Sequence, residues 1–350
     1  MVLQFGGNNA PVLFAHSLNP LKIAREAMIR LLAFFLLSFQ ANPATDDVGV
    51  FAKALWFMQA FGEAGCANPS SDRRLKSVLA LALVEDRALK IDELNGLIRP
   101  ESFEKFAGAD RSLTEAELEL ALEQNMPNSR RHLSPELRRH AELLTTTYDM
   151  IPADHIDPVE KLADWIVKNW KADGELHILS TCTGNSRRSI LGATMGNLAA
   201  SFYGFENVHF HSGGTIPSAF NKRTIATLKE IGFQIEPTGD EGERGDPKTP
   251  NPHYRISWGK GLQSVEFSKS YKDKSNPQSG FAAVLVCSEA DAECPTVPGA
   301  ALRLSMIFID PKLYDDGALE TKKYAERRDD IGRTFLAVMA NARRRLQEQH

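Results

Sequence analysis

The chain has 350 residues, of which 43% are hydrophobic and 25% charged, and its formal net charge is -4. This length and composition predict a folded protein of two domains with a large buried core. The acidic balance gives no reason to expect nucleic acid as a partner, and the basic cluster Arg343–Arg345 ends a predicted helix, where it favours the helix dipole. The four cysteines are too few for a structural disulfide framework.

Residues 1–45 contain an apolar segment with two interpretations. From Met28 the sequence is MIRLLAFFLLSFQANPA, which has the basic start, apolar run and small residues of a secretory signal. The run is too short for an ordinary membrane span. Phe39 occupies a poor position for cleavage after Ala41, and a buried amphipathic helix is the alternative. If Met28 starts the protein, export is expected.

Residues 46–172 are predicted to form an all-helical region. Ser112–Glu115 has the spacing of a capping box, and Ser134-Pro135 and Asp157-Pro158 each have the pattern of an N-cap followed by proline at the first helical position. A regulatory or dimerising module is the expected role, since no ligand-binding pattern occurs there. Apolar residues recur at spacings of three and four in Val50–Phe61, Arg73–Ala88, Thr114–Gln124, Pro135–Thr146 and Pro158–Trp170.

Residues 173–350 alternate apolar strands with helices and are predicted to form a catalytic domain. This alternation predicts an α/β fold with a parallel, doubly wound sheet covered on both faces. Within the long connection 238–280, residues 251–259 and 262–268 predict a β-hairpin. The other predicted elements are strands His177–Thr181, Val208–His211, Phe233–Ile235 and Ala282–Val286, and helices Arg188–Tyr203, Ser218–Ile231 and one from Leu319.

The octapeptide CTGNSRRS, residues 182–189, lies between a predicted strand and a predicted helix. Such a loop leaves backbone N–H groups unpaired at a helix N-terminus, where the helix dipole adds a positive potential. Phosphate, arsenate or sulfate can bind there. We therefore expect an oxyanion-binding loop made of Thr183, Gly184, Asn185, Ser186, Arg187, Arg188 and Ser189.

Cys182 is the predicted nucleophile, because a thiol beside a helix N-terminus and an arginine ionises readily. Gly184 and Asn185 tolerate the left-handed backbone that a tight anion-binding turn requires. Arg188 can bind two oxygens of the anion with its planar guanidinium, and Ser189 can donate a hydrogen bond to the thiolate. A buried cysteine under a turn is the alternative.

Two further cysteines lie downstream. Cys287 directly follows the predicted strand Ala282–Val286, and a polar loop leads on to Cys294. Because the carboxyl ends of parallel strands share one edge of a sheet, we expect Cys287 beside the 182–189 loop. The two later cysteines are too far apart for a C-x-x-C motif, but a flexible loop can close them into a disulfide. A zinc site is the metal alternative, and the lack of any paired C-x-x-C argues against it.

The three cysteines and the segment VCSEADAECPTVPG resemble the thioredoxin-coupled arsenate reductases, which share their fold and anion loop with the low-molecular-weight protein tyrosine phosphatases. The similarity runs from about His177 to Met339 and includes HSGGTIPSAFNKRTIATLKEIGFQI and FIDPK. The resemblance implies a domain of this type over residues 173–350, with an oxyanion as ligand and a thioredoxin-like reductant as partner. It implies no organic cofactor.

The resemblance also implies a cascade of thiols. Cys182 attacks arsenate, Cys287 attacks Cys182 with release of arsenite, and Cys294 attacks Cys287 to leave a disulfide for the reductant. Asp310, followed by a proline, stands where the family carries its general acid, and a turn before a helix is the alternative. A phosphatase needing neither later cysteine, and a non-catalytic oxyanion sensor, are the other functional hypotheses.

Some positions depart from the family pattern. Arg187 stands where several reductases have another cysteine. Asn185 and Ser212 match two ligands of a potassium site found in some reductases, but Ala193 replaces a glutamate, which argues against that site. Thiol chemistry needs a reduced resting state and so favours a cytoplasmic location, in contrast to the signal-like segment.

Overall fold

The structure is a computed structural model, and it describes residues 88–90, 104, 107, 110–114, 117, 126–293 and 296–348. Among these residues, no helix has both the length and the apolar character needed to cross a membrane. The predictions for residues 1–45, the helix at 50–61 and nearly all of the helices at 73–88 and 114–124 lie outside the described residues. Cys294 also lies outside them.

A short antiparallel pair corrects the prediction of an all-helical region before residue 172. The strands β1 (Leu89–Lys90) and β2 (Ser112–Leu113) pair with each other. Ser112 is therefore not a helix cap. The capping box instead joins Thr114 and Glu117, because the Thr114 N–H and hydroxyl both donate to Glu117 at 2.8 Å and the Glu117 N–H donates back at 3.3 Å. Both Ser112 and Thr114 are followed by a glutamate three residues later, so the pattern predicted the right motif in the wrong register.

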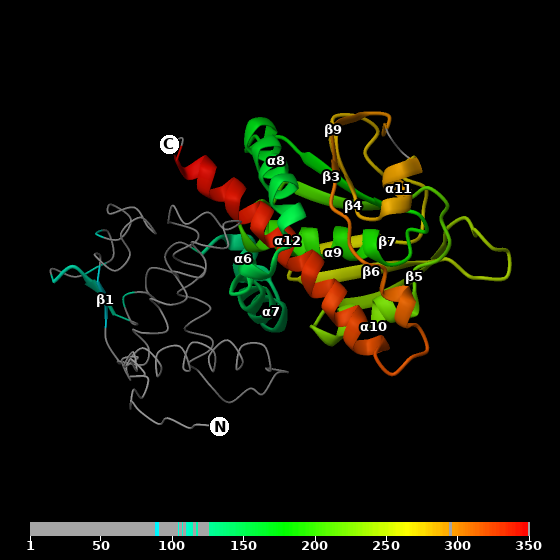
Figure 1. The fold of residues 1–350 in the computed structure, drawn as a ribbon, viewed down its shortest axis with the longest axis horizontal. Coiled ribbons are helices and arrows are strands. Elements are labelled where there is room, and N and C mark those ends of the chain that lie inside the picture. Colours follow the sequence, from blue (N-terminus) through cyan, green and yellow to red (C-terminus); the bar gives the residue numbers. More distant parts are fainter. Residues whose placement is uncertain are drawn as a thin grey trace, which may run out of the picture. The chain divides into compact units, whose positions relative to one another are not determined.

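A four-stranded parallel sheet lies at the centre of the part from residue 126 to 348. Its strands are β3 (Leu176–Cys182), β4 (Val208–Gly214), β8 (Phe281–Leu285) and β9 (Ala300–Ser305), in the order β4-β3-β8-β9 (Figure 1). The sheet contains the predicted strands 177–181, 208–211 and 282–286. The sequence did not predict β9, which is a half-exposed edge strand without a continuous apolar run.

The strand order reverses direction between β3 and β8. From β3 the chain passes outward to β4 on one side, and later to β8 and then β9 on the other. In open α/β sheets, ligands bind outside the carboxyl ends of the strands at such a switch point. Cys182 is the last residue of β3, and Cys287 follows the end of β8. The sheet therefore places both cysteines at the edge where ligand sites form.

A second sheet is antiparallel and contains β5 (Gln234–Glu241), β6 (Pro252–Gly259) and β7 (Leu262–Glu266) in that order. The predicted hairpin is confirmed, because β6 pairs with β7 across a tight turn. Gly261 in this turn has a φ of 73°, which glycine adopts without strain. The predicted strand 233–235 belongs to this sheet, as part of β5, and not to the parallel one.

Several helices contact the parallel sheet. α9 (Arg188–Phe202) is buried along its whole length and contacts β3, β4 and α12 (Glu320–Glu348), and α12 also contacts α7 (Pro135–Thr145) and α8 (Ala153–Asn169). Gly192 allows α9 to lie directly on the sheet, because a Cβ there would be 2.6 Å from Ser180 Oγ. The remaining helices are α6 (Asn128–His132), η2 (Tyr148–Met150), α10 (Lys222–Glu230), α11 (Ser288–Glu293) and η3 (Pro311–Tyr314).

The helix starts test the predicted caps. Ser134 caps α7, and Pro135 is its first residue, as predicted. The cap predicted at Asp157 is wrong, because α8 begins at Ala153 and contains Pro158 in its second turn. α10 begins later than predicted, since Asn221 caps it by accepting the Arg223 N–H at 2.8 Å.

Candidate functional site

A relay of hydrogen bonds reaches the sulfur of Cys182. Asn185 Oδ1 accepts the Lys269 backbone N–H at 2.8 Å, so the amide nitrogen of Asn185 is the group that faces Ser189 Oγ, at 2.9 Å. Ser189 Oγ in turn lies 3.0 Å from Cys182 Sγ. Because the serine oxygen accepts from Asn185, its hydroxyl hydrogen is available to the sulfur. This agrees with the hydrogen bond predicted between Ser189 and Cys182.

The carbonyl groups of the 182–189 loop are anchored on one side. In a trans peptide the C=O and the following N–H point in opposite directions, so the N–H groups that follow these carbonyls face the other side of the loop. The start of α9 at Arg188 adds the unpaired N–H groups of its first turn. The carbonyl oxygens of Cys182, Thr183, Gly184 and Ser186 accept hydrogen bonds from the N–H groups of Thr215, Ile216, Ser218 and Asn221 at 2.9–3.2 Å.

Asn185 adopts the left-handed backbone that the sequence predicted, with a φ of 39°. The same prediction is wrong for Gly184, which is not among the described residues with positive φ. Gly184 instead leaves room for Ser218, because a Cβ at position 184 would lie 3.2 Å from Ser218 Oγ, a tight contact. The tight turn therefore depends on one left-handed residue, and that residue also carries the hydrogen-bond relay.

Arg188 and Asp310 are in direct contact. Arg188 lies in the first turn of α9, only 7% exposed, and donates to the Phe308 carbonyl at 3.0 Å and to Asp310 Oδ2 at 2.7 Å. The other oxygen of Asp310 accepts the Lys312 N–H at 2.9 Å and caps η3. The structure thus brings together the predicted oxyanion-binding arginine and the predicted acid, and it also gives Asp310 the turn role that was the alternative. Both carboxylate oxygens of Asp310 therefore accept hydrogen bonds.

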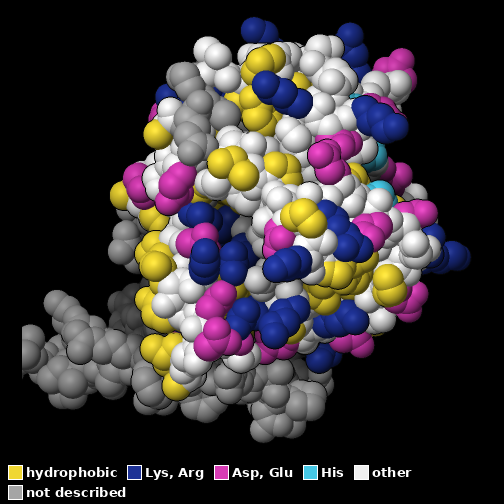
Figure 2. All heavy atoms as spheres, turned by 90° about the vertical axis from the view of Figure 1, so that its right-hand side faces the viewer, with side chains coloured by type: hydrophobic (Ala, Val, Ile, Leu, Met, Phe, Trp, Pro, Cys, Tyr) yellow, Lys and Arg dark blue, Asp and Glu magenta, His cyan; other side chains and the backbone are white. Residues whose placement is uncertain are grey.

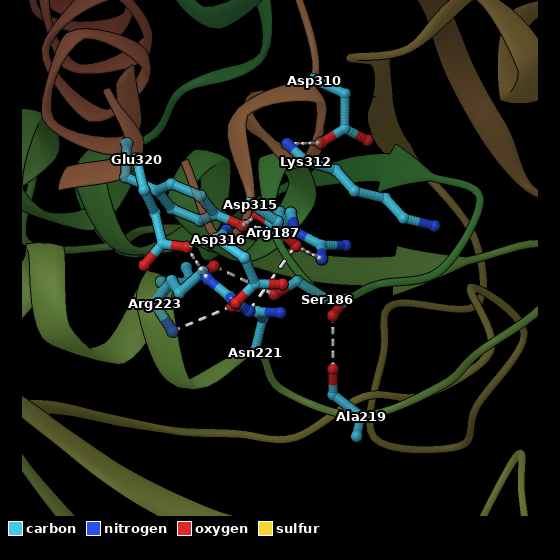
Figure 3. Close-up of polar contacts among 12 residues, drawn as sticks. Ser186, Arg187, Ala219, Asn221, Arg223, Asp310, Lys312, Asp315, Asp316 and Glu320 are labelled. Atoms are coloured by element: carbon cyan, nitrogen blue, oxygen red, sulfur yellow. Dashed lines mark hydrogen bonds and ion pairs between the residues drawn. The ribbon is translucent and has the colours of Figure 1, made fainter. Parts of the chain in front are cut away.

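Arg187 points its guanidinium at a different set of partners. It donates to Tyr324 Oη at 2.7 Å and to Asp315 Oδ2 at 3.0 Å, and Tyr324 donates to the other oxygen of Asp315 at 2.7 Å. Burial raises the pKa of Tyr324 to about 12, so it stays protonated as a donor. Arg223 also pairs with Asp315, at 3.6 Å, and with Glu320, at 2.6 Å (Figure 3). Arg187 was predicted to bind the oxyanion, but its side chain ties the loop to the start of α12.

Cys287 adjoins the loop, as expected from the edge of the sheet. Its Sγ lies 3.6 Å from Thr183 Oγ1 and accepts the Ala290 N–H at 3.4 Å, so the thiol also caps α11. Cys182 and Cys287 are both free thiols. Burial raises the pKa of Cys287, which favours its protonated form. The predicted partner Cys294 lies outside the described residues.

A buried ion pair beneath the loop was not predicted. Lys269 Nζ lies 3.8 Å from Glu266 Oε2, and the two side chains are only 4% and 3% exposed. Ser212 donates to the same oxygen of Glu266 at 2.6 Å. Asn185 and Ser212, which match potassium ligands in the resemblance, therefore contact Lys269 and Glu266. Only the charged residues at the end of the predicted hairpin hinted at this pair.

The surface near the site mixes basic and apolar side chains. Three apolar side chains are largely exposed: Ile216 (66%), Ile309 (62%) and Leu313 (76%). Ile216 lies on the segment that donates hydrogen bonds to the loop, Ile309 precedes Asp310, and Leu313 lies on η3. Figure 2 shows lysine and arginine side chains near the middle of the face that lies at the right of Figure 1, with acidic and apolar side chains among them.

Among the described residues, no group of three His, Cys, Asp or Glu side chains is arranged to hold a metal ion. Comparison with models of known protein families gave no match, and no curated protein matched the sequence.

Proposed function

We propose that the chain reduces arsenate to arsenite through a cascade of cysteine thiols, in a domain of the low-molecular-weight phosphatase type. The domain type is supported by the parallel sheet, in which β4 lies outside β3, and by the loop between β3 and α9. Reduction is supported by one observation above all. Thr183 Oγ1 lies 3.6 Å from Cys287 Sγ, so a second thiol adjoins the loop that begins at Cys182.

In the first step the Cys182 thiolate attacks arsenic. A sulfur–arsenic bond forms, one arsenic–oxygen bond breaks, and the leaving hydroxyl group takes a proton from Asp310 and departs as water. The loop N–H groups and Arg188 bind the remaining oxygens. Arg188 must exchange its 2.7 Å contact with Asp310 for these oxygens, and this exchange leaves Asp310 Oδ2 without its arginine partner.

In the second step the Cys287 sulfur, after losing its proton, attacks Cys182. The sulfur–arsenic bond breaks, its electron pair stays on arsenic, and arsenite leaves, so two thiols supply the two electrons and form a disulfide. Cys294 then attacks Cys287 and frees Cys182. A dithiol protein of the thioredoxin type reduces the resulting Cys287–Cys294 disulfide and is itself oxidised.

Hydrolysis of phosphomonoesters is the second candidate, and the position of Cys287 favours it. The thiol caps α11, and burial raises its pKa, which is the behaviour of a structural cysteine. In this reaction Cys182 forms a cysteinyl-phosphate that water hydrolyses, with Arg188 and Asp310 in the same roles. Cys287 and Cys294 are not required.

Steady-state assays with cysteine variants test the proposal. We expect arsenite production over many turnovers with a dithiol protein as reductant, and none from the Cys182→Ser or Cys287→Ser variants. Cys66→Ser removes the cysteine that has no part in the cascade and is the matched control. Unchanged arsenite production by Cys287→Ser contradicts the proposal. Aryl phosphate hydrolysis by the wild type and by Cys287→Ser, without arsenate turnover, establishes the phosphatase instead.

A further inference from the structure

The segment that follows β7 donates hydrogen bonds to the 182–189 loop. Ser268 Oγ donates to the Gly184 carbonyl at 3.0 Å, and the Lys269 N–H donates to Asn185 Oδ1 at 2.8 Å. The Lys269 carbonyl accepts the Gly214 N–H at 2.9 Å, at the end of β4. Ser268 and Lys269 therefore connect the loop to β4, although they are distant from both in the sequence.

A carboxyl group at the end of β7 and an ammonium group just after it are both buried. The side chains of Glu266 and Lys269 are only 3% and 4% exposed, and Lys269 Nζ lies 3.8 Å from Glu266 Oε2. Burial raises the pKa of the Glu266 carboxyl, and the nearby Lys269 partly offsets this rise. Lys269 Nζ also lies 4.7 Å from the centre of the Phe267 ring. Within the described part of the chain, Lys269 is the cationic side chain that pairs with Glu266. Removing one member of such a pair leaves the other charge buried and uncompensated, which is costly.

Lys269 contacts Glu266 through its side chain and Asn185 through its backbone. Its side chain compensates Glu266, while its backbone N–H starts the relay through Asn185 and Ser189 to Cys182 Sγ, with steps of 2.8, 2.9 and 3.0 Å. Ser212 fixes Glu266 from the other side at 2.6 Å. Any shift of Lys269 that follows from loss of the ion pair is therefore passed to the hydroxyl group that faces the Cys182 sulfur.

We propose that Glu266 and Lys269 form an internal charge pair that positions this relay and so keeps the Ser189 hydroxyl on the sulfur of Cys182. Lys269 is a positioning residue, and it supplies the cation that the buried carboxylate requires. The inference rests on the proposed role of Cys182 as a nucleophile, and it holds for either candidate reaction.

Alkylation of Cys182 by iodoacetamide at fixed pH, followed by mass spectrometry of its peptide, tests this inference in the full chain. We expect Lys269→Met to slow alkylation about tenfold, as loss of one hydrogen bond to a charged group would. The double variant Glu266→Gln/Lys269→Met removes both charges and keeps an acceptor for Ser212, so it is expected to regain most of the rate. Equal rates in Lys269→Met and the wild type, or a double variant no faster than the single one, would overturn the proposal.

Added cations test whether the positive charge of Lys269 is what matters. If Lys269 contributed only by packing, small cations would not restore the rate of Cys182 alkylation in a Lys269 variant. We expect potassium or methylammonium chloride to accelerate alkylation of Lys269→Ala more than choline chloride does at the same ionic strength, with no such difference in the wild type. Equal effects of the three salts on the variant contradict the role of the charge.

A second variant applies if the Lys269 variants do not fold. Ser212→Ala removes the hydrogen bond to Glu266 and leaves the ion pair with Lys269 in place. Slower alkylation of Cys182 in this variant supports the proposal, and an unchanged rate refutes it. Alkylation needs no oxyanion, so a wild type inactive on arsenate and aryl phosphates refutes the proposed function and leaves this test intact.

Discussion

Arg188 donates to Asp310 at 2.7 Å, so the arginine expected to bind the oxyanion and the acid expected to protonate the leaving oxygen neutralise each other. The Phe308 carbonyl holds the second branch of the guanidinium at 3.0 Å. An incoming oxyanion competes with Asp310 for Arg188. Binding of the anion and release of the acid are therefore a single exchange of partners.

Replacement of Asp310 by Asn separates binding from turnover. Asn can still cap η3, but it neither attracts Arg188 as strongly nor donates a proton as an acid does. We expect phosphate to bind at least as tightly as in the wild type, while turnover falls by about 10²- to 10⁴-fold. Calorimetric titration and steady-state assays give the two quantities. Glu289→Gln is the control, since Glu289 lies farther from Arg188, at 3.9 Å, and we expect this variant to keep most of the wild-type activity. Equal losses of affinity and turnover in Asp310→Asn contradict the exchange.

The two neighbouring arginines are expected to differ in function. Arg187→Met breaks the contacts with Tyr324 and Asp315 and is expected to lower the free energy of unfolding by about 1–3 kcal/mol, with little change in phosphate affinity. Arg188→Met is expected to abolish measurable phosphate binding. Urea denaturation and calorimetry distinguish the two effects. A large loss of affinity in a folded Arg187→Met variant shows that Arg187 binds the anion directly.

The pH dependence of arsenite release follows from Cys287. Burial raises the pKa of its thiol, so the attacking thiolate is scarce near neutral pH and increases as pH rises toward that pKa. We expect single-turnover arsenite release to accelerate between about pH 7 and about pH 9. Rapid mixing and quenching with arsenite detection measures this rate. A rate independent of pH over the same range means that deprotonation of Cys287 does not limit the second step.

The contact between α9 and the parallel sheet depends on Gly196. A Cβ at this position would overlap the Phe210 ring on β4. We expect Gly196→Ala to lower the free energy of unfolding by about 1–3 kcal/mol, because a closely packed interior cannot absorb the added atom. Gly174→Ala is the control, since its Cβ would have no neighbour closer than 3.6 Å. Equal stability of the two variants in urea contradicts this packing.

Local patterns predicted the features that depend on neighbouring residues. Strand, loop and helix around Cys182 follow from one continuous segment, and the position of Cys287 follows from the shared edge of parallel strands. The Ser134 cap also needs only the residues beside it. The sequence failed where two local choices compete, as at Pro158, which lies inside α8 although it follows a good capping residue.

The partners of charged residues could not be predicted from spacing. Arg187 and Arg188 are adjacent in the sequence, yet the first pairs with Asp315 and the second with Asp310. Lys269 and Asn185 are distant in the sequence, and their hydrogen bond exists only because the segment after β7 returns to the loop. These choices depend on tertiary packing, which brings each side chain within reach of one partner and not another.

Thiol mapping after a single turnover tests the central claim most directly. The reduced protein is mixed with arsenate without any reductant, free thiols are blocked, and the disulfides are identified by mass spectrometry. The cysteine cascade predicts one arsenite released for each chain, a disulfide between Cys287 and Cys294, and a free Cys182. Arsenite release without that disulfide, or three thiols that remain reduced after exposure to arsenate, would contradict the cascade.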